Sequence, residues 1–233
     1  ILAAAYGKYY ESDDFDFISI RSSFVNRRLV EADHEDGKAV HVWTVNSKTE
    51  MNQMKLLGVD NIITFDAHDP RVQNAIPLKG FETVQPAYQF VKGILREVTD
   101  LKIDSDHMMV ISPDEGGTNR AVYLASVLGL DVGMFYKRRD YSRIVDGRNP
   151  IVAHEFLGSS VEGKDVIIID DMISSGESMI DVATELKKRK ANRIFVVATF
   201  GLFTNGLEKF DQAVADGTIY KVVTTNLTYQ TPE

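Results

Sequence analysis

Short apolar, β-branched runs alternate along the chain with segments whose apolar residues recur at helical spacing. Eight runs are predicted to be strands: residues 16–20, 39–45, 61–65, 108–112, 131–136, 165–170, 193–199 and 220–225. Residues 178–190 follow one of these runs and place Ile180, Ala183 and Leu186 on one helical face. This alternation predicts an α/β fold of parallel sheets with helices on both faces. A closed barrel of eight strands is the alternative, but connections of uneven length favour open sheets.

Open parallel sheets bind ligands at the carboxyl ends of their strands, so the residues that follow each strand are candidates for chemistry. Asp66, His68 and Asp69 come directly after the run at 61–65. Imidazole and carboxylate groups together can hold a divalent cation, or a nucleotide phosphate through one. The alternative is a polar loop in which Asp69 precedes a proline turn.

A second candidate follows the run at 108–112. Asp114 is succeeded by Gly116 and Gly117, and a helix is predicted to begin near Thr118. Backbone N–H groups exposed at a helix start suit a phosphate oxygen. The alternative is an ordinary strand-to-helix turn in which the aspartate caps the helix.

The most specific candidate is the stretch DVIIIDDMISSGES at 165–178. Two aspartates, Asp170 and Asp171, end a run predicted to be a buried strand. Small residues that can present hydroxyl and N–H groups to a phosphate then open a helix: Ser174, Ser175, Gly176 and Ser178. The carboxylates would repel a phosphate, but they suit sugar hydroxyls or a magnesium ion. The alternative is that the two aspartates are charges at a helix N-terminus. It does not explain what compensates the desolvation of two carboxylates at the end of a buried strand.

Positive charge is concentrated in residues 136–158, which are predicted to form a mobile loop at a strand end. Lys137, Arg138 and Arg139 could stabilise the charge that develops on a transferring phosphoryl group. A solvated basic loop is the alternative, although the net charge of the chain is -8.

Composition limits the classes of function. The 233 residues allow one large domain or two small ones. A net charge of -8 argues against a nucleic-acid surface, because phosphate backbones require a basic face. The absence of cysteine excludes disulfides and thiolate chemistry, and a cytoplasmic location is expected. No apolar run approaches ~20 residues, so no membrane span is expected.

From about Gly58 onward the sequence resembles ribose-phosphate diphosphokinases, which make phosphoribosyl diphosphate and have the type I phosphoribosyltransferase fold. Four motifs carry the resemblance in the order of that family: FDAHD, SPDEGG, KRRD and DDMISSGES. The resemblance implies that ATP and ribose 5-phosphate are converted to phosphoribosyl diphosphate and AMP with Mg²⁺ as cofactor.

The same resemblance implies a role for each matching residue. His68 and Asp114 would hold Mg²⁺, and Lys137 and Arg139 would stabilise the transferred diphosphoryl group. The residues implied in substrate binding are Asp170, Asp171, Ser174, Ser175, Gly176, Ser178, Gly116 and Gly117. The family's common Asp-Thr-Gly-Gly-Thr loop reads Ser-Ser-Gly-Glu-Ser here, and Glu177 adds a negative charge near the expected phosphate.

Residues of about 1–64 resemble instead the last βα units of a glycerophosphodiester phosphodiesterase barrel, through GKAVHVWTVN and GVDNIIT. Trp43 and Asn46 would line that site, although core packing is the preferred interpretation of Trp43. The barrel's early His-Arg and Glu-x-Asp motifs are absent, which makes phosphodiester hydrolysis the least favoured activity.

Two domains are therefore expected: residues 1–80 as an N-terminal βα segment and 81–233 as a phosphoribosyltransferase-like domain. The acidic ATP loop and Arg-Gln-Asp segment of the diphosphokinases do not precede FDAHD. We expect a chimera that binds ribose 5-phosphate or another sugar phosphate but lacks the ATP-binding first domain of the diphosphokinases. An active diphosphokinase whose ATP contacts come from a partner chain is the second hypothesis. The alternative is a natural or designed chimera without activity. Exposed sheet edges favour a homo-oligomer.

Overall fold

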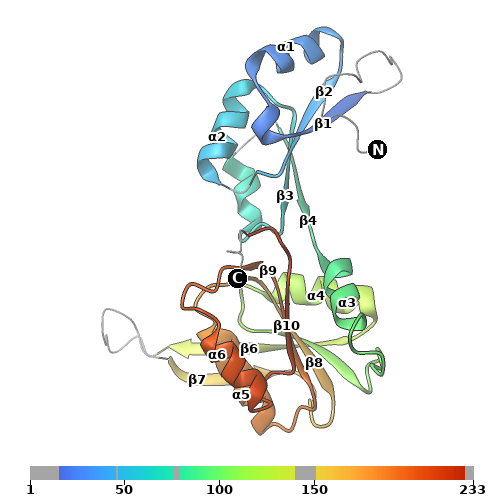
Figure 1. Ribbon diagram of the computed structural model, residues 1–233, viewed down its shortest axis with the longest axis vertical. Helices are drawn as coiled ribbons and strands as arrows, with labels where there is room; N and C mark the ends of the chain where they lie inside the picture. Colours follow the sequence, from blue (N-terminus) through green and yellow to red (C-terminus); the bar gives the residue numbers. More distant parts are fainter. Residues whose placement is uncertain (1–15, 46, 76–78, 140–150, 229–233) are drawn as a thin grey trace. The chain divides into compact units, whose positions relative to one another are not determined.

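The computed structural model describes residues 16–45, 47–75, 79–139 and 151–228, and it leaves the side chains of 70, 137–139 and 151–154 undescribed. The chain divides into two compact units, Ile1–Gln85 and Pro86–Glu233 (Figure 1). Each unit has its own sheet, parallel in the first unit and mainly parallel in the second, and its own apolar packing.

The first unit contains a four-stranded sheet in the order β1-β2-β3-β4. Its strands are β1 (Phe17–Arg21), β2 (Ala39–Trp43), β3 (Asn61–Phe65) and β4 (Gly80–Val84), all parallel. Its helices are η1 (Ser22–Phe24), α1 (Arg27–Glu35), α2 (Lys48–Leu57) and η2 (Pro70–Ala75).

Burial alternates along the first two strands of this unit, as expected of a sheet with one covered face. Ile20 and Val42 pack with Val30 of α1 and Met54 of α2 in one apolar cluster. Residues of opposite parity are more exposed, and Phe17 stacks on His41 with ring centroids 4.4 Å apart. Trp43 was expected in the core, but it lies on the more exposed face with Phe17 and His41, is only partly buried and is not a member of the cluster. Asn46 lies outside the described residues.

The second unit contains a six-stranded sheet in the order β10-β9-β8-β5-β6-β7. Its strands are β5 (Met108–Ser112), β6 (Asp131–Arg139), β7 (Ile151–Leu157), β8 (Asp165–Ile173), β9 (Ile194–Gly201) and β10 (Lys221–Thr224). Its helices are α3 (Ala87–Leu95), α4 (Thr118–Leu128), α5 (Glu177–Lys188) and α6 (Glu208–Ala215). All strand pairs are parallel except β6 with β7.

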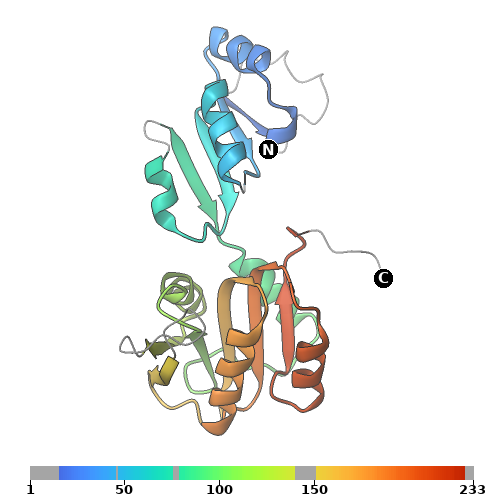
Figure 2. The same ribbon diagram turned by 90° about the vertical axis from the view of Figure 1, so that its left-hand side faces the viewer.

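Helices cover both faces of this second sheet. Phe90 of α3 and Leu124 of α4 belong to one apolar cluster, and Leu186 of α5 and Phe210 of α6 belong to another. The central strands β8 and β5 contribute buried residues to both clusters, with α5 and α6 in front of the sheet in Figure 2. The predicted α/β fold with parallel sheets is therefore confirmed, and both sheets are open rather than closed into a barrel.

The structure differs from the sequence prediction in several strands. Strands β4 and β7 were not predicted, and the interpretation of 136–158 as a loop is wrong for its ends. Strand β6 continues to Arg139 and pairs antiparallel with β7, while residues 140–150 lie outside the described residues. None of the helices that the structure describes is long and apolar enough to cross a membrane.

Candidate functional site

Two aspartates lie inside strand β8 rather than after it. The strand was predicted to end at Asp170 but continues to Ile173, because Asp170 pairs with Ala198 and Met172 with Phe200 of β9. The side chain of Asp170 is 20% exposed and that of Asp171 only 3%. Two adjacent carboxylates are therefore held at the end of a central strand, where their desolvation has to be offset.

Arg120 of α4 supplies the cation that these carboxylates need, and the sequence analysis did not single it out. Its Nη1 donates to Oδ1 of Asp170 at 3.4 Å and lies 3.9 Å from Oδ1 of Asp171. The arginine side chain is itself only 7% exposed. One signal was available, since a cation in the first turn of a helix opposes the helix dipole and needs a reason to be there.

The charge balance of this cluster changes the titration of Asp170. Burial, followed by the hydrogen bond and negative charge of Asp171, raises the pKa of Asp170 to about 7. The backbone N–H of Asp171, 2.9 Å from Oδ1 of Asp170, and the charge of Arg120 act in the opposite direction. The pair therefore gains or loses a proton close to neutral pH.

The turn after β5 is closed by Asp114. Its Oδ1 accepts from the backbone N–H groups of Gly116 and Gly117, at 3.0 and 3.2 Å. The Ser112 hydroxyl donates to the carbonyl of Asp114 at 2.6 Å. The carboxylate thus engages the two N–H groups that were predicted to bind a phosphate, but it does not cap α4, whose N-cap residue Gly117 has no side-chain cap.

The segment that follows β8 begins helix α5 without a side-chain cap. Gly176 is the N-cap residue with φ +81°, and it lies against the ring of Phe210. Ser174 and Ser178 are exposed, and Ser175 is partly exposed. The serine side chains therefore lie at or near the surface beside the N-terminus of α5, where the helix dipole favours an anion.

Glu177, the departure from the family's common loop, is paired with Lys209 of α6. Its Oε1 lies 2.6 Å from Nζ of Lys209, and both side chains are more than half exposed. The hydrogen bond and charge of Lys209 lower the pKa of Glu177. Lys209 thereby offsets the negative charge that Glu177 places beside the expected phosphate.

The His68 motif lies in the first unit, in the loop after β3. His68 is exposed and Asp66 is buried. Asp69 forms an ion pair with Arg71, whose hydrogen bonds lower the pKa of Asp69 to about 2. Within the residues that the structure describes, no group of three or more His, Asp or Glu side chains could hold a metal ion.

The predicted site residues thus fall into three sets. The structure brings the 114–117 turn, Arg120 and the aspartates of β8 together in the second unit, and the 174–178 segment follows directly from β8. His68 belongs to the first unit. Lys137 and Arg139 have their backbone in β6, but their side chains lie outside the description.

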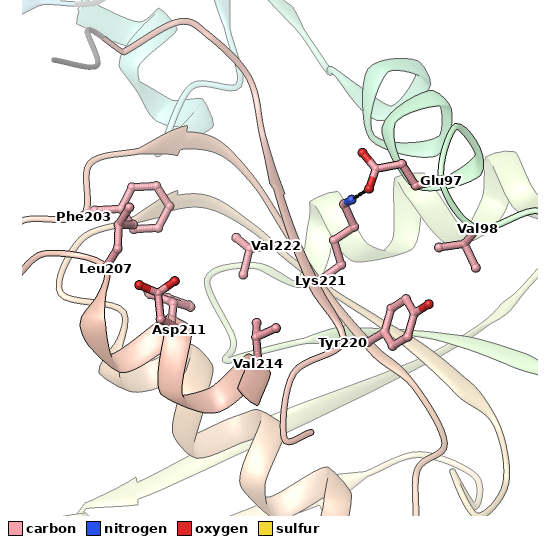
Figure 3. A pocket seen from close by; sticks show the side chains of 10 residues that line it. Glu97, Val98, Phe203, Leu207, Asp211, Val214, Tyr220, Lys221 and Val222 are labelled. Carbon is pink, nitrogen blue, oxygen red and sulfur yellow. Dashed lines mark hydrogen bonds and ion pairs between the residues drawn. The ribbon is translucent and has the colours of Figure 1, made fainter. Parts of the chain in front are cut away.

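A pocket of about 440 Å³ lies beside α6 and β10, and Figure 3 shows its lining. Phe203, Val214 and Val222 contribute apolar surface, and Lys221 forms an ion pair with Glu97. The pocket contains none of the predicted site residues. Phe210, one of the residues that line this pocket, also lies against Gly176.

Comparisons with known proteins match two different families to two parts of the chain. The family model of the phosphoribosyl transferase domain matches residues 80–227, and that of the glycerophosphoryl diester phosphodiesterase family matches residues 6–69. A ribose-phosphate pyrophosphokinase of Ralstonia nicotianae is 31% identical over 183 residues, which cover 78% of this chain and 52% of the relative. One of Vibrio parahaemolyticus is 32% identical over 177 residues, covering 75% of this chain and 52% of the relative.

The chain therefore spans about half the length of these curated relatives. Among solved structures, phosphoribosylpyrophosphate synthetase from Mycobacterium smegmatis has a TM-score of 0.59 and 19% identity. That match covers 86% of this chain and 66% of the other, and it supports the fold alone.

Proposed function

The chain belongs to the phosphoribosyl transferase domain family, and from that membership we propose that residues 170–178 bind ribose 5-phosphate. One observation carries the proposal. A pair of carboxylates on β8 and an uncapped helix N-terminus at Gly176 lie within one continuous segment, six residues apart. The segment thus offers acceptors for sugar hydroxyls and donors for a phosphate at the two ends of one small ligand.

The two ends of the site do different work. Asp170 and Asp171 accept hydrogen bonds from the ribose hydroxyls, and Arg120 limits the repulsion between the two carboxylates. Ser174, Ser175 and Ser178 donate to the phosphate together with the first N–H groups of α5. The pairing of Glu177 with Lys209 keeps the local charge compatible with an anion.

Titration calorimetry of the full chain with ribose 5-phosphate tests this proposal. We expect saturable binding at millimolar ligand or below, with backbone chemical-shift changes concentrated in residues 170–178. Inorganic phosphate should bind more weakly at the same residues, and free ribose should give no measurable heat. Absence of both heat and chemical-shift changes at millimolar ribose 5-phosphate would contradict the proposal.

A second candidate function is diphosphokinase activity, with ATP contacts supplied by a partner chain. The names of the curated relatives, ribose-phosphate pyrophosphokinases at about 30% identity, favour it. By this proposal Lys137 and Arg139 stabilise the transferred diphosphoryl group. The resemblance also assigns Mg²⁺ to His68 and Asp114, which belong to different units, and Oδ1 of Asp114 accepts hydrogen bonds from Gly116 and Gly117. We derive no step through the ion.

A coupled assay for AMP release tests this second function. We expect release to depend on both ATP and ribose 5-phosphate and to fall at least about 100-fold in Lys137→Ala, since loss of a group that stabilises transition-state charge has effects of this size. Ribose 5-phosphate binding should survive that substitution. No AMP release by the wild-type chain at high concentration would reject diphosphokinase activity and leave sugar-phosphate binding untouched.

We also propose that the first unit derives from a phosphodiesterase barrel, which would make the chain a chimera. The match over residues 6–69 supports this, as does a sheet whose apolar cluster lies on the side of α1 and α2. Helices on one side only are what a βα fragment of a barrel would have. The inactive chimera remains the alternative, and self-association and a cytoplasmic location remain predictions.

A further inference from the structure

One buried guanidinium serves two buried carboxylates at the end of β8. Arg120 is 7% exposed, and its Nη1 lies 3.4 Å from Asp170 and 3.9 Å from Asp171. It is the third residue of α4, where the helix dipole disfavours a positive charge. The carboxylates therefore account for the arginine at this position better than the helix does.

The turn before α4 explains how the arginine reaches the strand. A Cβ on Gly117 would lie 2.8 Å from Oγ of Ser112 and 3.5 Å from the carbonyl oxygen of Ile169. The missing side chain lets the turn approach β8 one residue before Asp170. The hydrogen bonds that Asp114 accepts then hold the turn closed. In this structure the Asp114–Gly117 turn positions Arg120.

The guanidinium also orients the carboxylate of Asp170. Two hydrogen bonds, from Nη1 of Arg120 and from the backbone N–H of Asp171, fall on the same oxygen, Oδ1. Oδ2 carries neither of these two hydrogen bonds, and an incoming hydroxyl would replace the side-chain hydrogen bond between Asp170 and Asp171. The positive charge meanwhile opposes the burial and the negative charge of Asp171, which favour protonation of Asp170. Arg120 thus keeps acceptors available on both aspartates.

We propose that Arg120 is a positioning residue that makes this site select pentose phosphates with two adjacent hydroxyls over their deoxy analogues. The proposal rests on the proposed binding of ribose 5-phosphate at residues 170–178. Above about pH 7 both oriented carboxylates are ionised and accept hydrogen bonds from two neighbouring hydroxyls. A ligand that lacks one hydroxyl leaves a desolvated carboxylate without its donor, which costs affinity. Without the guanidinium the pair retains a proton and loses an acceptor, so the preference disappears.

The test compares three ligands on the full chain by calorimetry: ribose 5-phosphate, 2-deoxyribose 5-phosphate and inorganic phosphate. The wild type should prefer ribose 5-phosphate to its deoxy analogue by at least about tenfold. Arg120→Gln should bind ribose 5-phosphate at least about tenfold more weakly and reduce the preference to about twofold or less. Its affinity for inorganic phosphate should change by no more than about twofold, because the phosphate end of the site is intact. Arg120→Lys should restore part of the preference, since it keeps the charge.

Arg193→Lys is the matched control. Arg193 pairs with Asp165 at the other end of β8, at 2.7 Å, and the substitution weakens a comparable pair without touching the site. Its preference should equal that of the wild type. A folded Arg120→Gln protein that keeps the preference, or that loses ribose 5-phosphate and phosphate affinity in equal proportion, overturns the proposal.

The outcomes also distinguish failure of the proposed binding of ribose 5-phosphate from failure of the proposed role of Arg120. If Arg120→Gln does not fold, the test uses Arg120→Lys instead. A preference for ribose 5-phosphate over its deoxy analogue that equals that of the wild type in this variant overturns the proposal. If the wild type binds no ribose 5-phosphate, the proposed function itself fails. If the wild type binds ribose 5-phosphate and the Arg120 variants show the same preference for it over the deoxy analogue, only the proposed role of Arg120 fails.

Discussion

The Asp170→Asn variant should be more stable than the wild type at pH 8 and equally stable near pH 4. The pKa of Asp170 is raised from 3.8 to about 7 in the folded state, first by burial and then by Asp171. A group whose folded pKa exceeds its unfolded pKa stabilises the fold below the unfolded value, and that contribution is lost as pH rises through the folded value. The wild type therefore loses stability between about pH 4 and pH 8, and asparagine removes this loss.

The size of the effect follows from the shift. Three pKa units correspond to at most about 4 kcal/mol, and relaxation around a coupled pair lowers this, so we expect about 2 kcal/mol at pH 8. The single tryptophan, Trp43, lies in the first unit and does not report on β8. Native-state hydrogen exchange of β8 and β9 amides, followed from pH 5 to pH 8 and corrected for intrinsic rates, measures the free energy of opening in the second unit.

Asp216→Asn is the control of opposite sign. Asp216 is exposed, and hydrogen bonds from Thr218 lower its pKa. Such a group stabilises the fold above its unfolded pKa, so its replacement should cost stability at neutral pH and little in acid. A difference between Asp170→Asn and the wild type that stays constant across pH would contradict the assignment of Asp170.

A carboxylate that destabilises the fold at neutral pH requires a reason to be there. Active and binding sites commonly keep groups that cost stability, because the ligand needs them in place. By this reasoning Asp170→Asn should gain stability while losing affinity for ribose 5-phosphate. A variant that gained stability without weakening binding would leave the aspartate pair without a functional explanation.

The strands that the sequence predicted best are those whose identity depends on local pattern. Residues 61–65 and 108–112 are β-branched or continuously apolar, and both strands match their predictions to the residue. Strand β7 was missed because its apolar residues sit in an arginine-rich, polar context and only its antiparallel pairing with β6 defines it. The last three residues of β8 were missed because aspartate disfavours strands, and pairing with β9 overrides that preference.

The candidate site could likewise be predicted only where a local sequence pattern marks its residues. The 165–178 stretch contains its own local signal, so its aspartates, hydroxyls and glycine were predicted together as residues of one site. Arg120 was missed because its partner Asp170 lies 50 residues away, and no local pattern reveals such a contact. From the sequence, Asp114 could be interpreted equally as a ligand or a helix cap, whereas the structure shows it closing the turn before α4 through Gly116 and Gly117.

Gly176→Ala should be the most damaging small substitution in the 174–178 segment. Gly176 has φ +81°, a region in which an L-residue costs about 1–2 kcal/mol. An added Cβ would also overlap the ring of Phe210, which is only 4% exposed and packs edge-on against Phe203. Overpacking of this kind adds about 1–3 kcal/mol, so the second unit should lose about 2–5 kcal/mol.

Gly129→Ala separates the two causes. Gly129 ends α4 with φ +69°, and nothing lies within 4 Å of the position of its Cβ. Its replacement should therefore cost only the backbone contribution, about 1–2 kcal/mol, and leave ribose 5-phosphate affinity unchanged. The excess loss in Gly176→Ala then measures the contact with Phe210, and Phe210→Leu in the same chain should recover part of it, as a double-mutant cycle by hydrogen exchange would show. Equal losses of stability in the two glycine variants would mean that the Phe210 ring moves aside at no measurable cost. In that case the ring does not hold the start of α5 in place, and the geometry of the phosphate end of the site would have to come from the serines alone.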